Sequence, residues 1–166
     1  NKNLQLLNLS GLLSKLGGWE YDVAEDKYYL TDQMYLMRGL KIGDELNFKN
    51  TLNFYTPEDA AILKSKIDQL MLTGDPYDHE MQMNTLSGDK IWVRSIGYSE
   101  MKKGKVVKAY GAVQDITKRK RDQQKLVDSE TNLKAIINNT DFGIWAIDKE
   151  YRLIAVSYTH LTLPTN

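Results

Sequence analysis

Residues 77–117 read YDHEMQMNTLSGDKIWVRSIGYSEMKKGKVVKAYGAVQDIT, and this stretch decides the fold. It contains three strand-like segments separated by two turns, Ser87–Asp89 and Lys102–Gly104. Both turns contain the glycine and polar residues that favour short hairpins. The three segments are Tyr77–Leu86, Lys90–Tyr98 and Val106–Ile116. The stretch therefore predicts three consecutive antiparallel strands.

Two shorter strands are predicted upstream of this stretch. Trp19, Tyr21 and Val23 alternate with acidic residues, as in a strand with one buried face. After the polar turn Ala24–Asp26, the segment Lys27–Thr31 continues the pattern. These two strands are therefore expected to form a hairpin.

Two helices are predicted between the two sets of strands. The first runs over Thr31–Arg38 and is stopped by Gly39. The second begins at Pro57, has acidic residues at the next two positions, and ends within Thr73–Pro76. The sequence therefore predicts an α+β fold, in which a five-stranded antiparallel sheet carries helices on one face and is followed by a linker helix.

Both flanking segments are predicted to be helical. Residues 1–16 form an amphipathic helix that ends at Gly17 and Gly18, and it either caps the sheet or continues an upstream coiled coil. Its apolar stripe consists of Leu6, Leu9, Leu12, Leu13 and Leu16. Residues 118–140 form a charge-rich linker helix with coiled-coil spacing. Its seam consists of Leu126, Leu133, Ile136 and Ile137. We expect the two helices to join two protomers into a homodimer.

An internal repeat indicates that a second unit begins after the linker. The segment Gly17–Asp22, GGWEYD, is echoed by Gly143–Asp148, GIWAID. Each copy follows an apolar helix and precedes a second strand, so residues 141–156 are predicted to start a second, truncated domain. Residues 157–166 contain no Asp, Glu, Lys or Arg. They look like a translated cloning or sequencing adapter rather than native sequence, and we expect the chain to be a piece of a longer protein.

A set of residues spread over 3–117 matches one family pattern. The set consists of Gly18, Trp19, Asp22, Tyr28, Leu30, Arg38, Gly39, Pro57, Glu58, Asp59, Glu80, Gly88, Trp92, Val93, Arg94, Gly111, Asp115, Ile116 and Thr117. In these residues the chain resembles the PAS sensory family, in the subgroup common in bacterial sensor histidine kinases and diguanylate cyclases. One departure is Gln82, where the subgroup usually carries arginine, so an ion pair with Glu80 is lost. The resemblance implies a PAS domain over residues 17–117.

The resemblance also implies a cavity between the sheet and the helices. This cavity either binds a small molecule or is filled by side chains, since methionines suit both an irregular ligand and a ligand-free core. The candidate lining residues are Met34, Met37, Phe54, Met81, Met83, Val93, Gly111 and Val113. They single out no particular ligand.

The end of the last strand is the candidate signal relay. Asp115 ends the strand and Thr117 starts the linker helix, so either side chain can cap the free amides of that helix. By resemblance, Asp115 also pairs with Arg94 on the neighbouring strand. The relay set is Arg94, Asp115, Ile116 and Thr117.

Composition excludes several classes of chemistry. The 166 residues include no cysteine, which excludes disulfides, thiolate metal sites, a cysteinyl-flavin adduct and c-type haem attachment. The 22 basic residues balance the 22 acidic residues, so no global field attracts a nucleic acid. The basic run Lys118–Arg121 is better explained as a solvated helical turn than as a nucleic-acid patch. No stretch is long and apolar enough to span a membrane, and we expect a cytoplasmic location.

No catalytic or metal-ligating constellation is evident. His79 lies in a strand, and the other histidine, His160, lies in the doubtful tail, so a metal site would lack a second credible imidazole. Glu58 and Asp59 point to different sides of a helix, and the helix dipole explains them. No phosphate-binding glycine loop occurs. We therefore expect no catalytic, metal or evident cofactor site in this fragment.

These observations predict a sensory and relay module of a multi-domain bacterial signal-transduction protein. By family association, a sensor histidine kinase is expected beyond the C-terminus. The alternatives are a ligand-free PAS dimerisation module and the sensory part of a diguanylate cyclase or phosphodiesterase. A dry core would favour the dimerisation module, whereas a cavity with converging polar groups would favour the sensor.

Overall fold

The computed structural model describes residues 11, 13–138 and 144–157. The chain divides into two compact units, with the boundary between Lys118 and Arg119. Among the described residues, no helix is long and apolar enough to cross a membrane.

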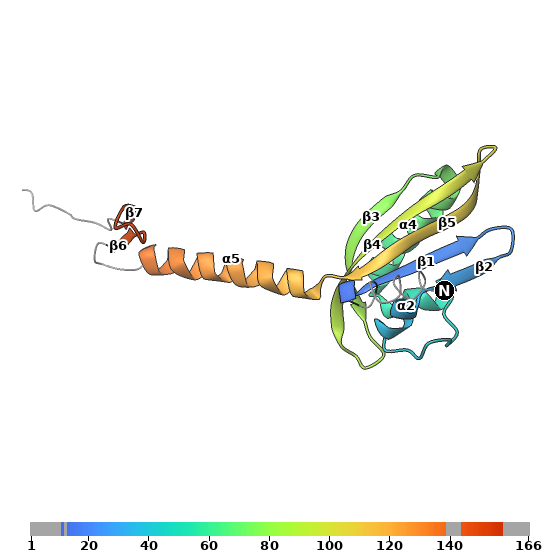
Figure 1. The fold of residues 1–166 in the computed structure, drawn as a ribbon, viewed down its shortest axis with the longest axis horizontal. Helices are drawn as coiled ribbons and strands as arrows, with labels where there is room; N and C mark the ends of the chain where they lie inside the picture. The colour runs from blue at the N-terminus through green and yellow to red at the C-terminus, as the bar shows by residue number, and fades with distance from the viewer. Residues whose placement is uncertain (1–10, 12, 139–143, 158–166) are drawn as a thin grey trace, which may run out of the picture. The chain divides into compact units, whose positions relative to one another are not determined.

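The first unit is built on an antiparallel sheet (Figure 1). Within the described residues this sheet has five strands in the order β2-β1-β5-β4-β3. The strands are β1 (Leu16–Asp22), β2 (Lys27–Leu30), β3 (Tyr77–Asn84), β4 (Lys90–Lys102) and β5 (Lys105–Asp115). The first and last segments of the unit meet at the centre of the sheet, where β1 pairs with β5. The predicted five-stranded antiparallel sheet is confirmed.

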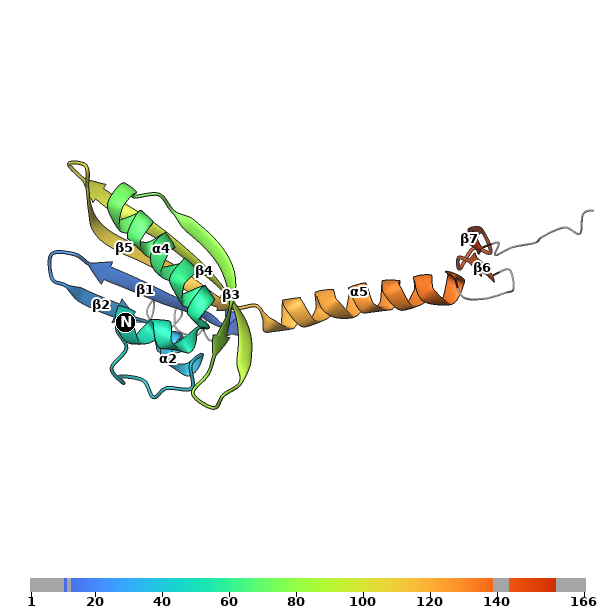
Figure 2. The same cartoon turned by 180° about the vertical axis from the view of Figure 1, so that it is seen from behind.

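The helices of this unit lie on one face of the sheet, as Figures 1 and 2 show from opposite sides. They are α2 (Asp32–Leu36), α3 (Phe48–Thr51), the 3₁₀ turn η1 (Leu52–Phe54) and α4 (Pro57–Thr73). The longest, α4, is capped by the Thr56 hydroxyl, which accepts a hydrogen bond from the Asp59 amide at 3.2 Å. It ends at Gly74, whose left-handed φ of 82° suits glycine.

The main core lies between the sheet and α4. Leu63 and Leu70 of α4 are buried against the inner face of the sheet. On that face Met81, Met83 and Val93 are almost completely buried. Alternate strand residues point to the opposite, outer face, because side chains alternate along a strand. The sheet therefore has an inner, helix-covered face and an outer face.

The N-terminal helix ends earlier than its leucine stripe predicts. Positions 11, 13 and 14 are helical, Lys15 turns the chain with a φ of 52°, and Leu16 is already in β1. Leu16 pairs with Gln114 of β5, so the sheet takes a residue that the periodicity assigned to the helix. The rest of the predicted helix, residues 1–10 and 12, lies outside the described residues.

The second unit contains most of a long helix and a hairpin. The helix α5 (Thr117–Asn138) begins at the end of the first unit. Leu126, Leu133 and Ile136 are each more than half exposed on it. The hairpin consists of β6 (Ile144–Ile147) and β7 (Leu153–Ser157), which pair antiparallel. The predicted second domain stays a prediction. Ser157, the first residue of the predicted tail, is the last residue of β7, and residues 158–166 lie outside the described residues.

Candidate functional site

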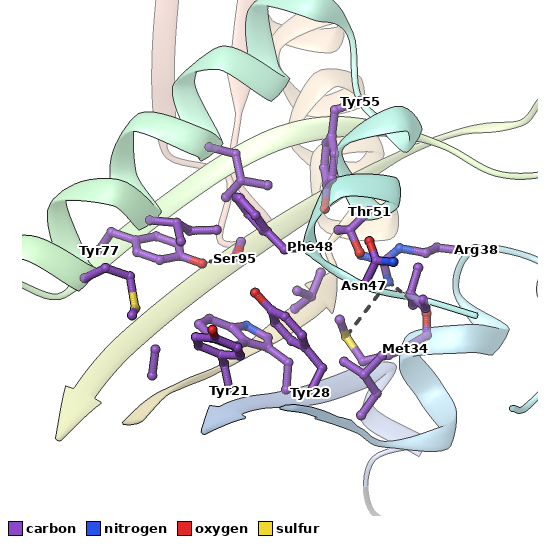
Figure 3. A pocket seen from close by; sticks show the side chains of 18 of the residues that line it. Tyr21, Tyr28, Met34, Arg38, Asn47, Phe48, Thr51, Tyr55, Tyr77 and Ser95 are labelled. Carbon is purple, nitrogen blue, oxygen red and sulfur yellow. Dashed lines mark hydrogen bonds between the residues drawn. The ribbon is translucent and has the colours of Figure 1, made fainter. Parts of the chain in front are cut away.

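The inner face of the sheet and the helices that cover it surround a cavity of about 250 Å³ (Figure 3). Every strand of the sheet contributes to its walls, as do α2, α3 and α4. The walls are mostly apolar, and include Trp19, Tyr28, Leu30, Met34, Ile67 and Val113. A concave, largely apolar site with a few polar groups is typical of small-molecule binding sites.

Three glycines make room for large side chains that line this cavity. A Cβ atom on Gly111 would lie 2.8 Å from the Trp19 indole and even closer to the Ile96 carbonyl oxygen. A Cβ atom on Gly97 would overlap the Tyr77 ring, and one on Gly17 would lie 2.7 Å from the Met34 sulfur. Since Trp19, Tyr77 and Met34 all line the cavity, its shape depends on the absence of side chains at these three positions.

Tyr77 and Ser95 form one polar group in the cavity. Their hydroxyls are 3.2 Å apart and buried, on the neighbouring strands β3 and β4. Burial raises the pKa of Tyr77 to about 12, although the hydrogen bond with Ser95 opposes this effect. Burial likewise raises the pKa of Tyr28 to about 12. Both phenols are therefore neutral near pH 7 and can only donate or accept hydrogen bonds.

Arg38 is the one basic residue among the described residues that line the cavity. Its side chain has an exposure of 0%. The Nη1 atom donates a hydrogen bond to the Met34 carbonyl oxygen at 2.8 Å, and the guanidinium carbon lies 5.7 Å from the centre of the Phe54 ring. The Nε and Nη2 atoms have no hydrogen-bond partner among the described residues. Buried polar groups are nearly always paired, so this arginine is an exception that asks for an explanation.

The neighbours of Arg38 are uncharged groups. Burial lowers the pKa of the Arg38 guanidinium, and the nearby Tyr55 opposes that shift. Burial also raises the pKa of Tyr55, so its hydroxyl is neutral. Figure 3 shows Arg38, Asn47, Thr51 and Tyr55 at one end of the cavity, and Tyr77 with Ser95 at the other. A guanidinium stays protonated even when buried, so this end of the cavity is positively charged.

The last strand is joined to the start of α5 by a short chain of hydrogen bonds. The Asp115 carboxylate accepts a bond from the Thr117 amide at 2.8 Å. The Thr117 hydroxyl accepts one from the Trp92 amide at 3.0 Å, and the Ile116 amide donates to the Trp92 carbonyl oxygen at 2.8 Å. The first turn of α5 is thus fixed to both β4 and β5.

Asp115 also contacts the residue that precedes β1. Its amide donates to the Lys15 carbonyl oxygen at 3.1 Å, and the Lys15 ammonium lies 3.3 Å from its carboxylate. Burial opposes ionisation of Asp115, but the hydrogen bonds from Thr117 and Lys15 outweigh it and hold the pKa of this carboxyl below its ordinary value. The segments that enter and leave the domain therefore meet at one carboxylate.

Comparison with known proteins decides the family. A family model described as the PAS fold matches residues 27–113, which is more than half of the 166-residue chain. The chain belongs to the PAS family. The predicted resemblance is confirmed.

Two solved PAS-type structures are similar to this chain. A sensory box histidine kinase/response regulator from Burkholderia thailandensis is 25% identical with a TM-score of 0.60, over 78% of this chain and 98% of that one. The N-terminal domain of a diguanylate cyclase with a PAS/PAC sensor from Marinobacter aquaeolei has a TM-score of 0.57 at 16% identity, over 63% of this chain and 97% of that one. The chain therefore contains a PAS domain that is similar to one from a histidine kinase/response regulator and that shares its fold with one from a diguanylate cyclase.

One curated relative matches over a limited length. The uncharacterized protein y4lL of Sinorhizobium fredii is 28% identical over 90 residues, which are 54% of this chain and 11% of that protein. The matched stretch is thus a small part of that relative.

The PAS cavity contains two of the eight predicted lining residues, Met34 and Val113. Met37, Met81, Met83 and Val93 are instead buried in the core, and Phe54 packs against it. Gly111 acts indirectly, by making room for Trp19. The physical reason is position along the strands. Periodicity identifies the inner face, but it does not show which part of that face is packed: an isolated bridge between Tyr55 and Met83 holds the chain before α4 beside β3, and both residues belong to the buried core cluster.

The sequence prediction left out the polar lining residues, among them Arg38, Asn47, Thr51, Tyr77 and Ser95. The family pattern includes this arginine as the end of the first short helix, but it does not indicate where the side chain points. Met34 and Arg38 are four residues apart, which puts them on one side of a helical turn. An arginine on the same side as a methionine in the predicted core was the signal that could have identified it.

The predicted pair between Arg94 and Asp115 is wrong. Arg94 donates from Nε to Oδ1 of Asp78 at 2.8 Å and from Nη2 to the other oxygen of the same carboxylate. The strand register explains this. Asp115 lies opposite Val93, and Arg94 lies opposite Gln114, so Arg94 and Asp115 point to different faces of the sheet. Arg94 therefore belongs to the outer face and takes no part in the contacts of Asp115.

The remaining titratable candidates occupy ordinary structural positions. His79 lies in β3 opposite Ser95, and the described residues contain no cluster of three or more potential metal ligands. Besides its helix-capping contact, Asp59 accepts a hydrogen bond from the Gln82 amide at 3.3 Å, which ties the start of α4 to β3. The run Lys118–Arg121 lies in the first turns of α5.

Proposed function

We propose that this chain is the sensory and relay part of a multi-domain bacterial sensor histidine kinase, with its output domain beyond the C-terminus. The state of the cavity is passed through the end of β5 into α5. The 25% identical relative from a histidine kinase/response regulator supports this assignment of the output. Such a domain would lie in the cytoplasm, where a kinase finds ATP.

The observation that carries this proposal is the position of Asp115. Val113 lines the cavity, and Asp115 follows it by two residues on the same strand. Because the Asp115 carboxylate holds the first amide of α5, a shift of β5 along its axis moves or breaks this cap. If the cap has two alternative arrangements, a small shift of β5 can change the balance between two conformations of the protein.

The cavity favours a ligand sensor over a ligand-free dimerisation module. A purely structural core would be filled by side chains at the density of other protein interiors. Here about 250 Å³ is left between the sheet and the helices, and Arg38 together with the Tyr77–Ser95 pair lines it. A space of this size, with polar groups at two ends, supports binding of a small molecule.

We also propose that α5 pairs with its copy in a homodimer. Leu126 and Leu133 are seven residues apart, and both are more than half exposed. Ile136 and Ile137 continue the apolar seam toward the C-terminal end of the helix. A second copy of α5 would bury this seam in a two-stranded coiled coil. In such a dimer, a change at the first turn of α5 shifts one helix relative to its partner and so changes the register of the coiled coil.

The relay is tested in a chimera. Residues 1–138 replace the sensory domain of a histidine kinase whose autophosphorylation is easily measured, with the heptad register of the linker preserved. We expect Asp115→Ala to change the autophosphorylation rate about fivefold, the factor that corresponds to the loss of about 1 kcal/mol of capping energy. Far-UV circular dichroism of the isolated variant should show a shorter α5.

The matched control is Asp78→Ala. It also removes a carboxylate that is paired with a basic side chain, but one that lies in β3 on the outer face rather than at the junction of β5 and α5. The control chimera is expected to keep the wild-type rate. If the folded Asp115→Ala chimera keeps the wild-type rate as well, the proposed relay is wrong.

A further inference from the structure

Arg38 presents a specific edge of its guanidinium. The two nitrogens without a partner among the described residues, Nε and Nη2, are the pair whose N–H bonds run parallel. Arg94 uses these same two atoms to hold both oxygens of the Asp78 carboxylate. The chain thus contains one example of this edge engaged by a carboxylate at the surface, and a second, buried copy of the edge on Arg38, which lines the cavity.

No protein carboxylate balances the charge of Arg38 inside the cavity. Among the described residues that line it, the one carboxylate is Asp68 of α4. Asp68 is exposed and lies 2.5 Å from the Lys64 ammonium, one helical turn away. The closer polar neighbours of Arg38 are the neutral Tyr55 hydroxyl and the Met34 carbonyl oxygen. A buried cation without a counter-charge is unfavourable, so an anion that reaches it gains a strong interaction.

We propose that the cavity binds a small organic acid, whose carboxylate pairs with Nε and Nη2 of Arg38. The body of this ligand lies against the apolar walls formed by Trp19, Tyr28 and Leu30. The volume of about 250 Å³ is below the range of drug-sized sites, which selects a compact body such as a single ring or a short chain. This inference names the ligand class of the sensor proposed above and therefore rests on that proposal.

The charge of the site favours a carboxylate over a phosphate. One guanidinium balances one negative charge, whereas a phosphate monoester carries nearly two at pH 7. The groups near Arg38 add no second cation, since Tyr55, Asn47 and Thr51 are neutral. The mostly apolar walls also suit a ligand with one charged end and an apolar body.

The test is calorimetric titration of the full chain after unfolding, dialysis and refolding to remove bound molecules. The probes are benzoate, hexanoate and indole-3-acetate, with benzamide as the neutral analogue of benzoate and inorganic phosphate as the alternative anion. We expect at least one carboxylate to bind, and benzamide and phosphate to bind at least about tenfold more weakly than it does.

Variants assign the binding to Arg38. Arg38→Met removes the charge at similar volume, and Arg38→Lys keeps a charge but loses the parallel N–H pair. Both are expected to weaken carboxylate binding about tenfold or more, whereas Arg94→Met, which removes the outer copy of the same edge, leaves the dissociation constant unchanged. Near-UV circular dichroism confirms that each variant has folded.

Two results would overturn the inference. One is the absence of binding by all three carboxylates at millimolar concentration. The other is wild-type affinity in folded Arg38→Lys or Arg38→Met. The proposed relay fails by a different result, because the Asp115→Ala chimera is measured without any added acid.

Discussion

Arg38 and Arg94 show how differently one chemical group behaves on the two sides of the sheet. On the outer face, Arg94 is exposed and holds the Asp78 carboxylate with two hydrogen bonds. On the inner side, Arg38 is fully buried and donates from Nη1 to two uncharged acceptors, the Met34 carbonyl oxygen and the Met34 sulfur. Exposed ion pairs contribute little to stability because water competes for both partners. The buried arginine has no such competition, so the inner side is where charge can determine which ligand binds.

The largest expected effect concerns the shape of the inner face. Gly111→Ala adds a methyl group that would overlap the Ile96 carbonyl oxygen and press against the Trp19 indole. We expect a loss of about 3 kcal/mol in the free energy of unfolding, as for severe overpacking. The measurement is urea unfolding, followed by tryptophan fluorescence and circular dichroism.

The adjacent residue supplies the control for the outer face. Ala112 follows Gly111 on β5 and points to the other side of the sheet. Ala112→Ser is expected to change the free energy of unfolding by no more than about 0.5 kcal/mol. Equal losses of unfolding free energy in the two variants would show that the inner face at Gly111 is packed no more tightly than the outer face at Ala112.

The second effect compares the two arginines in protein freed of bound molecules. Arg38→Met is expected to raise the free energy of unfolding by about 1–2 kcal/mol, because it replaces an unbalanced buried charge with an apolar side chain of similar size. Arg94→Met is expected to leave stability almost unchanged, since its partner stays in contact with water. Urea unfolding of both variants measures the difference. A large destabilisation by Arg38→Met would show that the arginine is needed for the fold itself.

Much of the fold could be predicted because it depends on local signals. The turns at Gly88 and Gly104 and the helix start at Pro57 are marked by residues with few alternative conformations. The inner face of β3 and β4 follows from the alternation of large apolar residues such as Met81, Met83 and Val93. The N-terminal helix was predicted too long because the same leucine spacing continues into β1, where pairing with β5 determines the structure of Leu16.

The site was harder to predict because it depends on distances between segments. The sequence near Met81 and Val113 does not show that Met81 is packed in the core whereas Val113 lines the cavity. The alternation along the strands assigns both residues to the same inner face. The pairing of Arg94 depended on register, and a shift by one residue exchanges one face for the other. Arg38 was placed in the family pattern, but its burial follows only from the way α2 and the residues around Tyr55 pack over the sheet.

The smallest expected effect concerns Asp115, a carboxylate of intermediate burial between the two extremes that the arginines represent. Its pKa is held below the ordinary value, so its contribution to stability is fully present above about pH 4 and is lost as the pH falls through the lowered pKa. We expect less than about 1 kcal/mol, because the group is partly exposed and solvent screens its interactions. The amide resonance of Thr117, which donates to this carboxylate, should shift in nuclear magnetic resonance spectra with the same midpoint.

The control is Asp115→Asn. This variant lacks the titrating group, so the chemical shift of its Thr117 amide should stay constant over this pH range. A wild-type midpoint at or above the ordinary aspartate value would show that the cap does not favour the ionised carboxylate, and the first turn of α5 would then lack the electrostatic hold that the relay requires.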